Sequence, residues 1–253
     1  MGAFAAFAFV SGAVAGSFVS VVAHRIPRGE SIVGPRSRCP QCGHRVAAYD
    51  NVPIVSWVLL RGRCRSCGER ISPAYPIVEL ALGAAFLATA LVFRGQPAEL
   101  ALGLVFVTML AAVTLTDLER RMIPNVVLAA GALAGAGLVL AAYPDSLAEH
   151  GIAAAAAGGA LLIVAVAYPR GMGMGDVKLA AVMGLYLGRA VAPALLVGFA
   201  AGALVGAGMM LRHGAAARKR AIPFGPFLAL GGLAALFAGD QLVEAYLDTF
   251  AAS

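Results

Sequence analysis

The chain contains little charge for its length. Only 13% of its 253 residues are Asp, Glu, Lys or Arg, whereas soluble domains usually have about 25%. The apolar fraction is 60% and the mean hydropathy is +0.85, which excludes an ordinary water-soluble enzyme and a disordered chain. Cysteine is also scarce, because four residues in the whole chain are too few for a disulfide-rich secreted module. The composition indicates a polytopic membrane protein.

Several common catalytic motifs are absent from the sequence. There is no His-Glu-x-x-His for a zinc protease and no Gly-x-Ser-x-Gly for a serine hydrolase. The phosphate-binding loop of nucleotide hydrolases is missing as well. A run of alternating glycines at Gly171, Gly173 and Gly175 follows an apolar stretch and not a predicted strand, so we do not interpret it as a nucleotide-binding loop.

The long apolar stretches predict an all-α fold with about eight transmembrane helices. Crossing a bilayer takes about 20 apolar residues, and most of the stretches reach or approach that length. The sixth is short, and the last is interrupted at Gly239-Asp240. The predicted spans are 2–23, 76–93, 98–117, 124–143, 151–168, 176–188, 191–211 and 223–247.

The distribution of Lys and Arg predicts the orientation of these spans. Cytoplasmic loops of membrane proteins carry an excess of both residues. With both termini outside, 17 of the 19 basic residues lie at or near the inner face, and only Arg94 and Arg189 face out. The net charge of +6 therefore reflects membrane-edge clusters, and we expect no nucleic-acid partner.

All four cysteines lie in the first predicted inner loop, as two Cys-x-x-Cys-Gly pairs. Four thiolates suit tetrahedral Zn²⁺ in a closed, structural site, and the sequence predicts that Cys39, Cys42, Cys64 and Cys67 share one ion. Two disulfides are the competing interpretation, but a cytosolic loop is kept reduced. His44 could replace a cysteine as ligand, although a solvated loop position explains it equally.

Three acidic residues lie at the inner ends of predicted spans, where acids are costly and commonly functional. They are Asp117, Asp176 and Glu79. Each has a structural alternative: Asp117 could pair with Arg120 or Arg121, Asp176 could cap its helix, and Glu79 could complement a helix dipole. The predicted topology places Asp117 and Asp176 at the same face, where a close carboxyl pair could activate water as in aspartic proteases.

Further motifs accompany these residues in a specific order along nearly the whole chain. They are Gly16-Ser17-Phe18, His24-Arg25-Ile26-Pro27, Asn51-Val52-Pro53-Ile54-Val55-Ser56-Trp57, Arg61-Gly62-Arg63-Cys64, Tyr75-Pro76-Ile77-Val78-Glu79-Leu80, Ile123-Pro124-Asn125 and Gly173-Met174-Gly175-Asp176. In this order and spacing the chain resembles the type IV prepilin peptidases, bifunctional leader peptidases and N-methyltransferases of bacterial inner membranes. One departure from the family pattern is Ser20, where Asn is usual.

The resemblance implies an activity and its residues. Asp117 and Asp176 correspond to the catalytic aspartates of the family, which remove a short basic leader from type IV prepilins or pseudopilins after a glycine. It further implies N-methylation of the new N-terminus with S-adenosylmethionine, and Gly62 corresponds to a glycine linked to that activity. Since the leader is basic, we expect an acid such as Glu79 or Glu119 to recognise it.

These inferences together predict three parts of the chain: a first transmembrane helix at 1–23, a cytosolic zinc-binding loop domain at 24–75, and a transmembrane aspartic peptidase core at 76–253. The predicted location is the bacterial inner membrane, with the zinc loop and active site at the cytosolic face and anionic lipid attracting the basic loop. The alternatives are a non-enzymatic, zinc-stapled scaffold of a pilus or secretion assembly and a small transporter. Transporters carry their site near the bilayer midplane, whereas these carboxylates lie at the inner edge.

Overall fold

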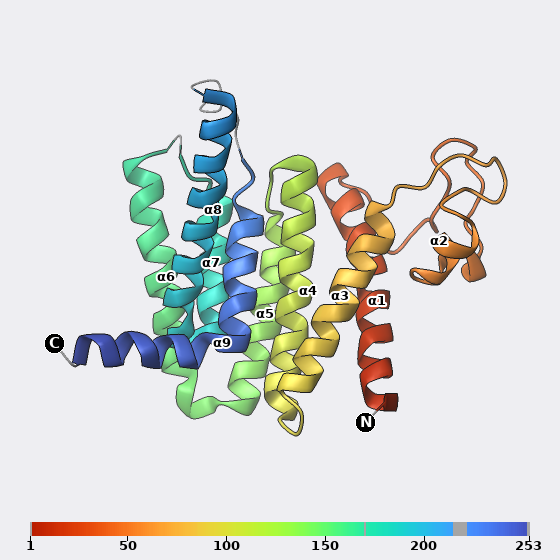
Figure 1. Ribbon diagram of the computed structural model, residues 1–253. Coiled ribbons are helices and arrows are strands. Elements are labelled where there is room, and N and C mark those ends of the chain that lie inside the picture. The colour runs from red at the N-terminus through yellow and green to blue at the C-terminus, as the bar shows by residue number, and fades with distance from the viewer. Residues whose placement is uncertain (1, 170, 215–221, 252–253) are drawn as a thin grey trace. The chain divides into compact units, whose positions relative to one another are not determined.

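The computed structural model describes residues 2–169, 171–214 and 222–251. The chain is all-α, as predicted, and the described part contains two isolated β-bridges but no strand. A short helix, α2 (Val55–Leu59), lies in the loop that carries the cysteines. The long helices are α1 (Gly2–Arg25), α3 (Ala74–Val92), α4 (Pro97–Arg120), α5 (Asn125–Ala142), α6 (Leu147–Ala167), α7 (Met174–Leu187), α8 (Val191–His213) and α9 (Gly225–Ala251) (Figure 1).

Each of the eight predicted spans corresponds to one of these helices, but about eight crossings is slightly more than the structure shows. Among the described residues, six segments are long and apolar enough to cross a membrane. One of the six runs over 39 residues from Met174 to Arg212 and contains both α7 and α8. The apolar part of α9, Gly225–Gly239, is shorter than a full crossing.

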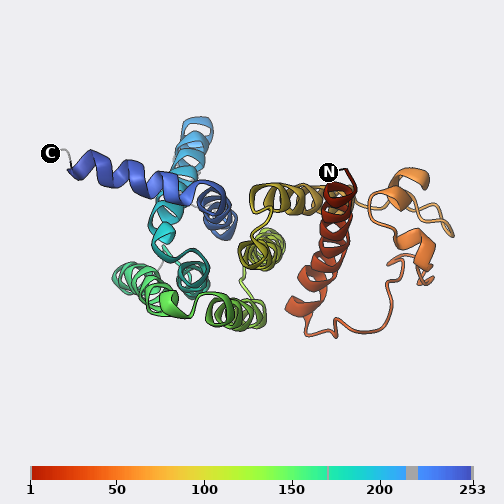
Figure 2. The ribbon, with the colours of Figure 1, turned by 90° about the horizontal axis from the view of Figure 1, so that it is seen from below.

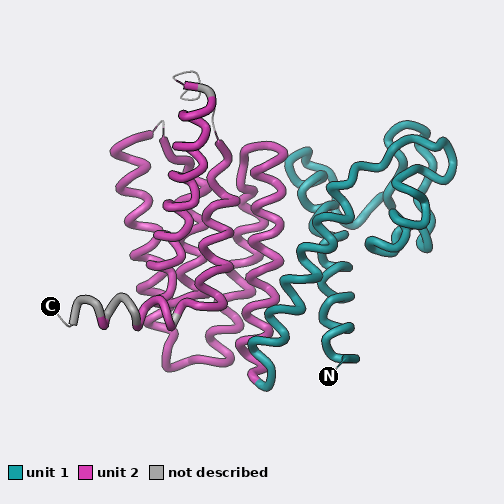
Figure 3. Tube along the Cα trace, viewed as in Figure 1, with its two compact units in different colours: residues 1–95 teal, residues 96–253 magenta. Residues whose placement is uncertain are grey.

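The sidedness of the helices stays a prediction. Part of the charge on which it rests lies outside the described residues, namely Arg170, Arg218, Lys219 and Arg220. The predicted domain boundaries at 23/24 and 75/76 are likewise untested. The chain divides into two compact units, residues 1–95 and 96–253 (Figure 3).

In the first unit, α1 packs against α3 through glycines that let the two backbones approach closely. A Cβ placed on Gly16 would lie 2.8 Å from the Glu79 Cα, and one on Gly12 would lie 2.6 Å from the Leu82 carbonyl oxygen. Helices associate in lipid chiefly through such close van der Waals packing, because lipid tails are as apolar as the side chains. Gly16 of the Gly-Ser-Phe motif therefore has a packing role.

The cysteine loop is tied to α3 by a buried carboxylate. Glu79, only 7% exposed, accepts a 2.7 Å hydrogen bond from the backbone N–H of Ile54. Ile54 itself has φ of +63°, a conformation that is costly for a β-branched residue. The hydrogen bond offsets part of that cost, because a buried N–H left without a partner would be costly.

The second unit is a helix bundle, which Figure 2 shows along the helices. In it α6 packs on α7, α8 packs on α9, and α4 contacts both α5 and α9. Gly184 of α7 lies directly against α6, where its Cβ would come within 2.6 Å of the Ala153 carbonyl carbon and oxygen. The α6–α7 contact therefore depends on the absence of a side chain at this position.

We expect the substitution Gly184→Ala to destabilise the protein by about 1–3 kcal/mol, because the methyl group overpacks a contact between two backbones. Thermal unfolding in detergent micelles measures the effect. Gly159→Ala in α6 is the matched control, since a Cβ at Gly159 meets nothing within 4 Å, and it should leave stability unchanged or slightly raised. Equal unfolding temperatures for the two variants would contradict the packing role of Gly184.

Candidate functional site

Asp117 lies in the last turn of α4 and is almost fully buried, with 6% of its surface exposed. The helix ends just after it, where Arg121 adopts a left-handed conformation and donates its N–H to the Asp117 carbonyl at 2.8 Å. The side chain is held by the first residue of another helix, because the Gly225 N–H of α9 donates to Asp117 Oδ2 at 2.8 Å. This contact joins positions 108 residues apart in the sequence.

Asp176 lies in the first turn of α7 and is half-buried. Its Oδ2 accepts a 3.1 Å hydrogen bond from the N–H of Gly173, the residue that precedes the helix. A side chain reaching back to the N-cap N–H in this way is half of a capping box, so the capping role considered for Asp176 is observed. Gly173 is suited to this position because a Cβ there would lie 3.3 Å from the same oxygen.

The bundle brings the two aspartates together. Asp117 and Asp176 come from α4 and α7, which both pack on α5 and on α9. The chain around them is also in contact, since a Cβ on Gly175 would lie 3.0 Å from the Ile123 Cβ. The Lys178 ammonium of α7 donates to Asn125 Oδ1 at 2.9 Å, which fixes the start of α7 against the start of α5.

The other two acids considered at the sequence level have different surroundings. Glu79 is buried, and its Oε2 accepts a hydrogen bond from the Ile54 N–H. This position does not support the predicted contact with a substrate leader. Glu119 is exposed, two residues after Asp117, and its role in leader recognition stays a prediction.

The four cysteines form one cluster in the first unit. Their Sγ atoms all lie within 4.8 Å of one another, and Cys39 Sγ lies 3.8 Å from Cys67 Sγ. All four are free thiols, because a disulfide requires about 2.05 Å between sulfurs. A regular tetrahedron with Zn–S bonds of about 2.3 Å has S–S edges of about 3.8 Å, so the cluster fits a zinc ion. His44 is exposed and not part of the four-thiol cluster.

Both cysteine pairs have the same local structure, built on the repeated pattern Arg-Cys-x-x-Cys-Gly-x-Arg. In each, the glycine N–H returns to the first cysteine's carbonyl at 2.9 Å, and the glycine has positive φ. The two arginines of each pattern form an isolated antiparallel β-bridge through their backbones, so that each cysteine pair lies in a closed turn, or knuckle. The N–H groups of Cys42 and Gln41 lower the pKa of the Cys39 thiol to about 7, which favours the thiolate that a metal requires.

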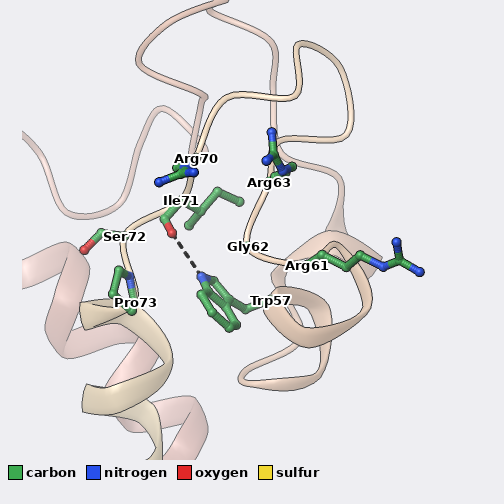
Figure 4. A pocket seen from close by; sticks show the side chains of 8 residues that line it. All are labelled: Trp57, Arg61, Gly62, Arg63, Arg70, Ile71, Ser72 and Pro73. Carbon is green, nitrogen blue, oxygen red and sulfur yellow. Dashed lines mark hydrogen bonds between the residues drawn. The ribbon is translucent and has the colours of Figure 1, made fainter.

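A cavity of about 550 Å³ lies beside the second knuckle and includes Gly62 (Figure 4). Gly62 is buried, has φ of +64°, and leaves no space for a side chain, since a Cβ would lie 2.8 Å from Cζ2 of Trp57. The indole is fixed in turn, because its N–H donates to the Ile71 carbonyl at 3.1 Å. The cavity is lined by Trp57, Arg61, Gly62, Arg63, Arg70, Ile71, Ser72 and Pro73.

Two features of these sites were not anticipated from the sequence: the contact of Gly225 with Asp117 and the contact of Ile54 with Glu79. The only local signal for the first is the turn Phe224-Gly225-Pro226 at the start of the last span. Such a turn marks a helix start and does not reveal which side chain the free N–H meets.

Comparison with known proteins gives two family matches. Residues 10–93 match the bacterial peptidase A24 N-terminal domain, and residues 104–211 match the type IV leader peptidase family. The two matches fall within the first and second compact units respectively. No solved structure shows a significant match.

Several relatives bear the name prepilin leader peptidase/N-methyltransferase. The chain is 40% identical to one from Myxococcus xanthus, over 84% of this chain and 65% of the relative. It is 37% identical to one from Bacillus subtilis, over 94% of this chain and 96% of the relative. A third, from Stutzerimonas stutzeri, is 32% identical over 97% of this chain and 94% of the relative. The resemblance inferred from the motifs is thereby confirmed, and the chain belongs to the type IV leader peptidase family.

Proposed function

We propose that the protein is an aspartic endopeptidase of the bacterial inner membrane that removes the leader of type IV prepilins or pseudopilins after a glycine. Its relatives carry the corresponding name. The observation that supports the chemistry best is the pair Asp117 and Asp176, which lie on helices packed on the same two neighbours and whose carboxyl groups are each held by a glycine N–H. The enzyme names of the relatives do not favour the scaffold alternative.

The proposed reaction needs only the two aspartates and water. Two neighbouring carboxyl groups cannot both ionise easily, so they share one proton. The ionised carboxylate takes a proton from the attacking water, and the protonated partner donates its proton toward the leaving amine, as in aspartic proteases. The peptide bond breaks, the oxygen of water is added to the glycine carbonyl, and the amine leaves as the new N-terminus.

The orientation proposed for this chemistry has both termini outside and the aspartates and cysteine loop at the cytosolic face. A basic leader would then remain in the cytosol while the hydrophobic helix of the substrate stays in the bilayer. Anionic lipid headgroups would attract the basic loop, at about 1 kcal/mol for each cation near the surface.

Replacing either aspartate by asparagine should lower prepilin cleavage by about 10²–10⁴-fold, because general acid and base catalysis is lost. Mass spectrometry of a prepilin incubated with wild type, Asp117→Asn and Asp176→Asn measures this. Glu149→Gln, at an acid far along the chain in α6, is the control and should cleave normally. A folded asparagine variant with undiminished cleavage would refute the paired mechanism.

We further propose that Cys39, Cys42, Cys64 and Cys67 hold a structural Zn²⁺. The four thiols occupy all tetrahedral positions and leave none for a substrate, so the ion would stabilise the loop and not act in cleavage chemistry. The 3.8 Å separation of Cys39 and Cys67 sulfurs supports this assignment.

Atomic emission analysis of the purified protein should find one zinc per chain, and Cys64→Ser should lose it together with part of the thermal stability. The reason is that binding free energy of a structural zinc is also folding free energy. His44→Ala, at an exposed position outside the cluster, should retain the zinc. Wild type without zinc, or full zinc in the serine variant, would contradict the proposal.

The methylating activity is proposed for the cavity around Gly62, where S-adenosylmethionine would supply a methyl group to the new N-terminus. Arginine guanidinium groups pair well with carboxylates, so those of the lining suit the carboxylate of the donor, and the Trp57 indole suits its adenine.

We expect Gly62→Ala to abolish methylation while cleavage continues, because the new methyl group displaces the Trp57 ring from the cavity. The mass of the mature pilin N-terminus reports both activities in one experiment. Gly29→Ala is the matched control: Gly29 also has positive φ, at +69°, but a Cβ there meets nothing within 4 Å. It carries the same backbone strain and should methylate normally. Equal loss of methylation in both variants would contradict the assignment of methylation to this cavity.

A further inference from the structure

The start of α9 reaches the reaction site through a single backbone group. The Gly225 N–H donates to Asp117 Oδ2 at 2.8 Å, and both residues are buried. Gly225 lies beyond the stretch matched by the type IV leader peptidase family, which ends at residue 211. The last helix therefore contributes to the site from outside the region that the family match covers.

The positions of Asp117 and Gly225 at opposite ends of their helices make this contact electrostatically favourable. Asp117 lies in the last turn of α4, where the negative end of the helix dipole disfavours an ionised carboxyl group. The N–H of Gly225, the first residue of α9, and the positive end of that helix's dipole face the same side chain. Asp176, by contrast, lies in the first turn of α7 and has this support from its own helix.

The available space restricts the residue at this position to glycine. A Cβ on Gly225 would lie 2.8 Å from Asp117 Oδ2 and 3.3 Å from both the Cβ and the Cγ of Asp117. The three nearest atoms all belong to Asp117. Gly173 has the same relation to Asp176, with a donated N–H and a Cβ position 3.3 Å from the accepting oxygen.

We propose that Gly225 is the positioning residue of Asp117, the counterpart of what Gly173 is for Asp176. Its N–H holds one carboxyl oxygen, and its missing side chain allows α9 to approach that oxygen closely. The inference rests on the proposed function only in that Asp117 is taken as catalytic. The contact itself can be tested without any cleavage assay.

A double-mutant cycle on thermal stability tests the contact. Gly225→Ala should lower the unfolding temperature in the wild-type background, because its methyl group collides with the Asp117 carboxyl group. In an Asp117→Ala background the colliding oxygen and Cγ are gone, so the same change should cost little. Equal losses in the two backgrounds would overturn the inference. If Gly225→Ala alone does not fold, recovery of folding in the double variant supports the contact and failure of both variants overturns it.

Cleavage kinetics test whether Gly225 positions Asp117 for the reaction. Gly225→Ala should lower kcat by about 100-fold, the effect of an ångström-scale displacement of a catalytic group, with KM nearly unchanged. Gly206→Ala in α8, where a Cβ meets nothing within 4 Å, should keep wild-type kinetics. A folded Gly225→Ala variant with wild-type kcat would overturn the positioning role. Failure of wild type to cleave any prepilin would instead refute the proposed function and leave the stability cycle valid.

Discussion

The absence of water from the bilayer core determines most of this structure. Backbone N–H and C=O groups there must find partners within the protein, which is why the apolar part of the chain forms long helices. The same condition confines polar chemistry to helix ends, where N–H groups of the first turn and C=O groups of the last turn remain unpaired. Asp117 and Asp176 lie at such ends, and each takes a hydrogen bond from a residue at a helix start. The aspartates and their hydrogen-bond donors therefore lie at the ends of the same helices whose apolar sides pack together.

The two proposed activities fall in different compact units. The cysteine cluster and the cavity around Gly62 belong to residues 1–95, whereas the aspartate pair belongs to residues 96–253. The two family matches respect the same division. On the proposed assignment, a substitution in the first unit can abolish methylation without abolishing cleavage.

The sequence was sufficient for the fold class and for the cysteine cluster, since both depend on local patterns. A run of apolar residues such as 98–117 can only be a helix in lipid, and the structure has α4 at Pro97–Arg120. The two Cys-x-x-Cys-Gly pairs share one residue pattern, and both form the same turn in the structure. The number of crossings was predicted less well, because α7 and α8 follow each other in one apolar segment.

The contacts that complete the sites could not be predicted, because they join distant parts of the chain. Nothing in the residues around Asp117 indicates that its partner is Gly225, and nothing around Glu79 points to Ile54. A backbone N–H has no sequence signature, so its acceptor is known only from the packed structure. Tertiary packing also determines the surroundings of Glu79. Its position in the sequence made it a candidate for leader recognition, but in the structure it is buried and accepts the Ile54 N–H.

Each glycine contact occupies one oxygen of a carboxyl group and leaves the other oxygen for the reaction. In each aspartate the glycine N–H bonds to a single carboxyl oxygen, and the described residues place no hydrogen bond on the other. Anchoring and proton transfer can thus use different oxygens, and neither carboxyl group has to rotate during turnover. Donors that are already oriented cost no reorganisation as charge develops. On the proposed mechanism, the substrate would meet the second oxygen of each carboxyl group while the first stays bonded to its glycine.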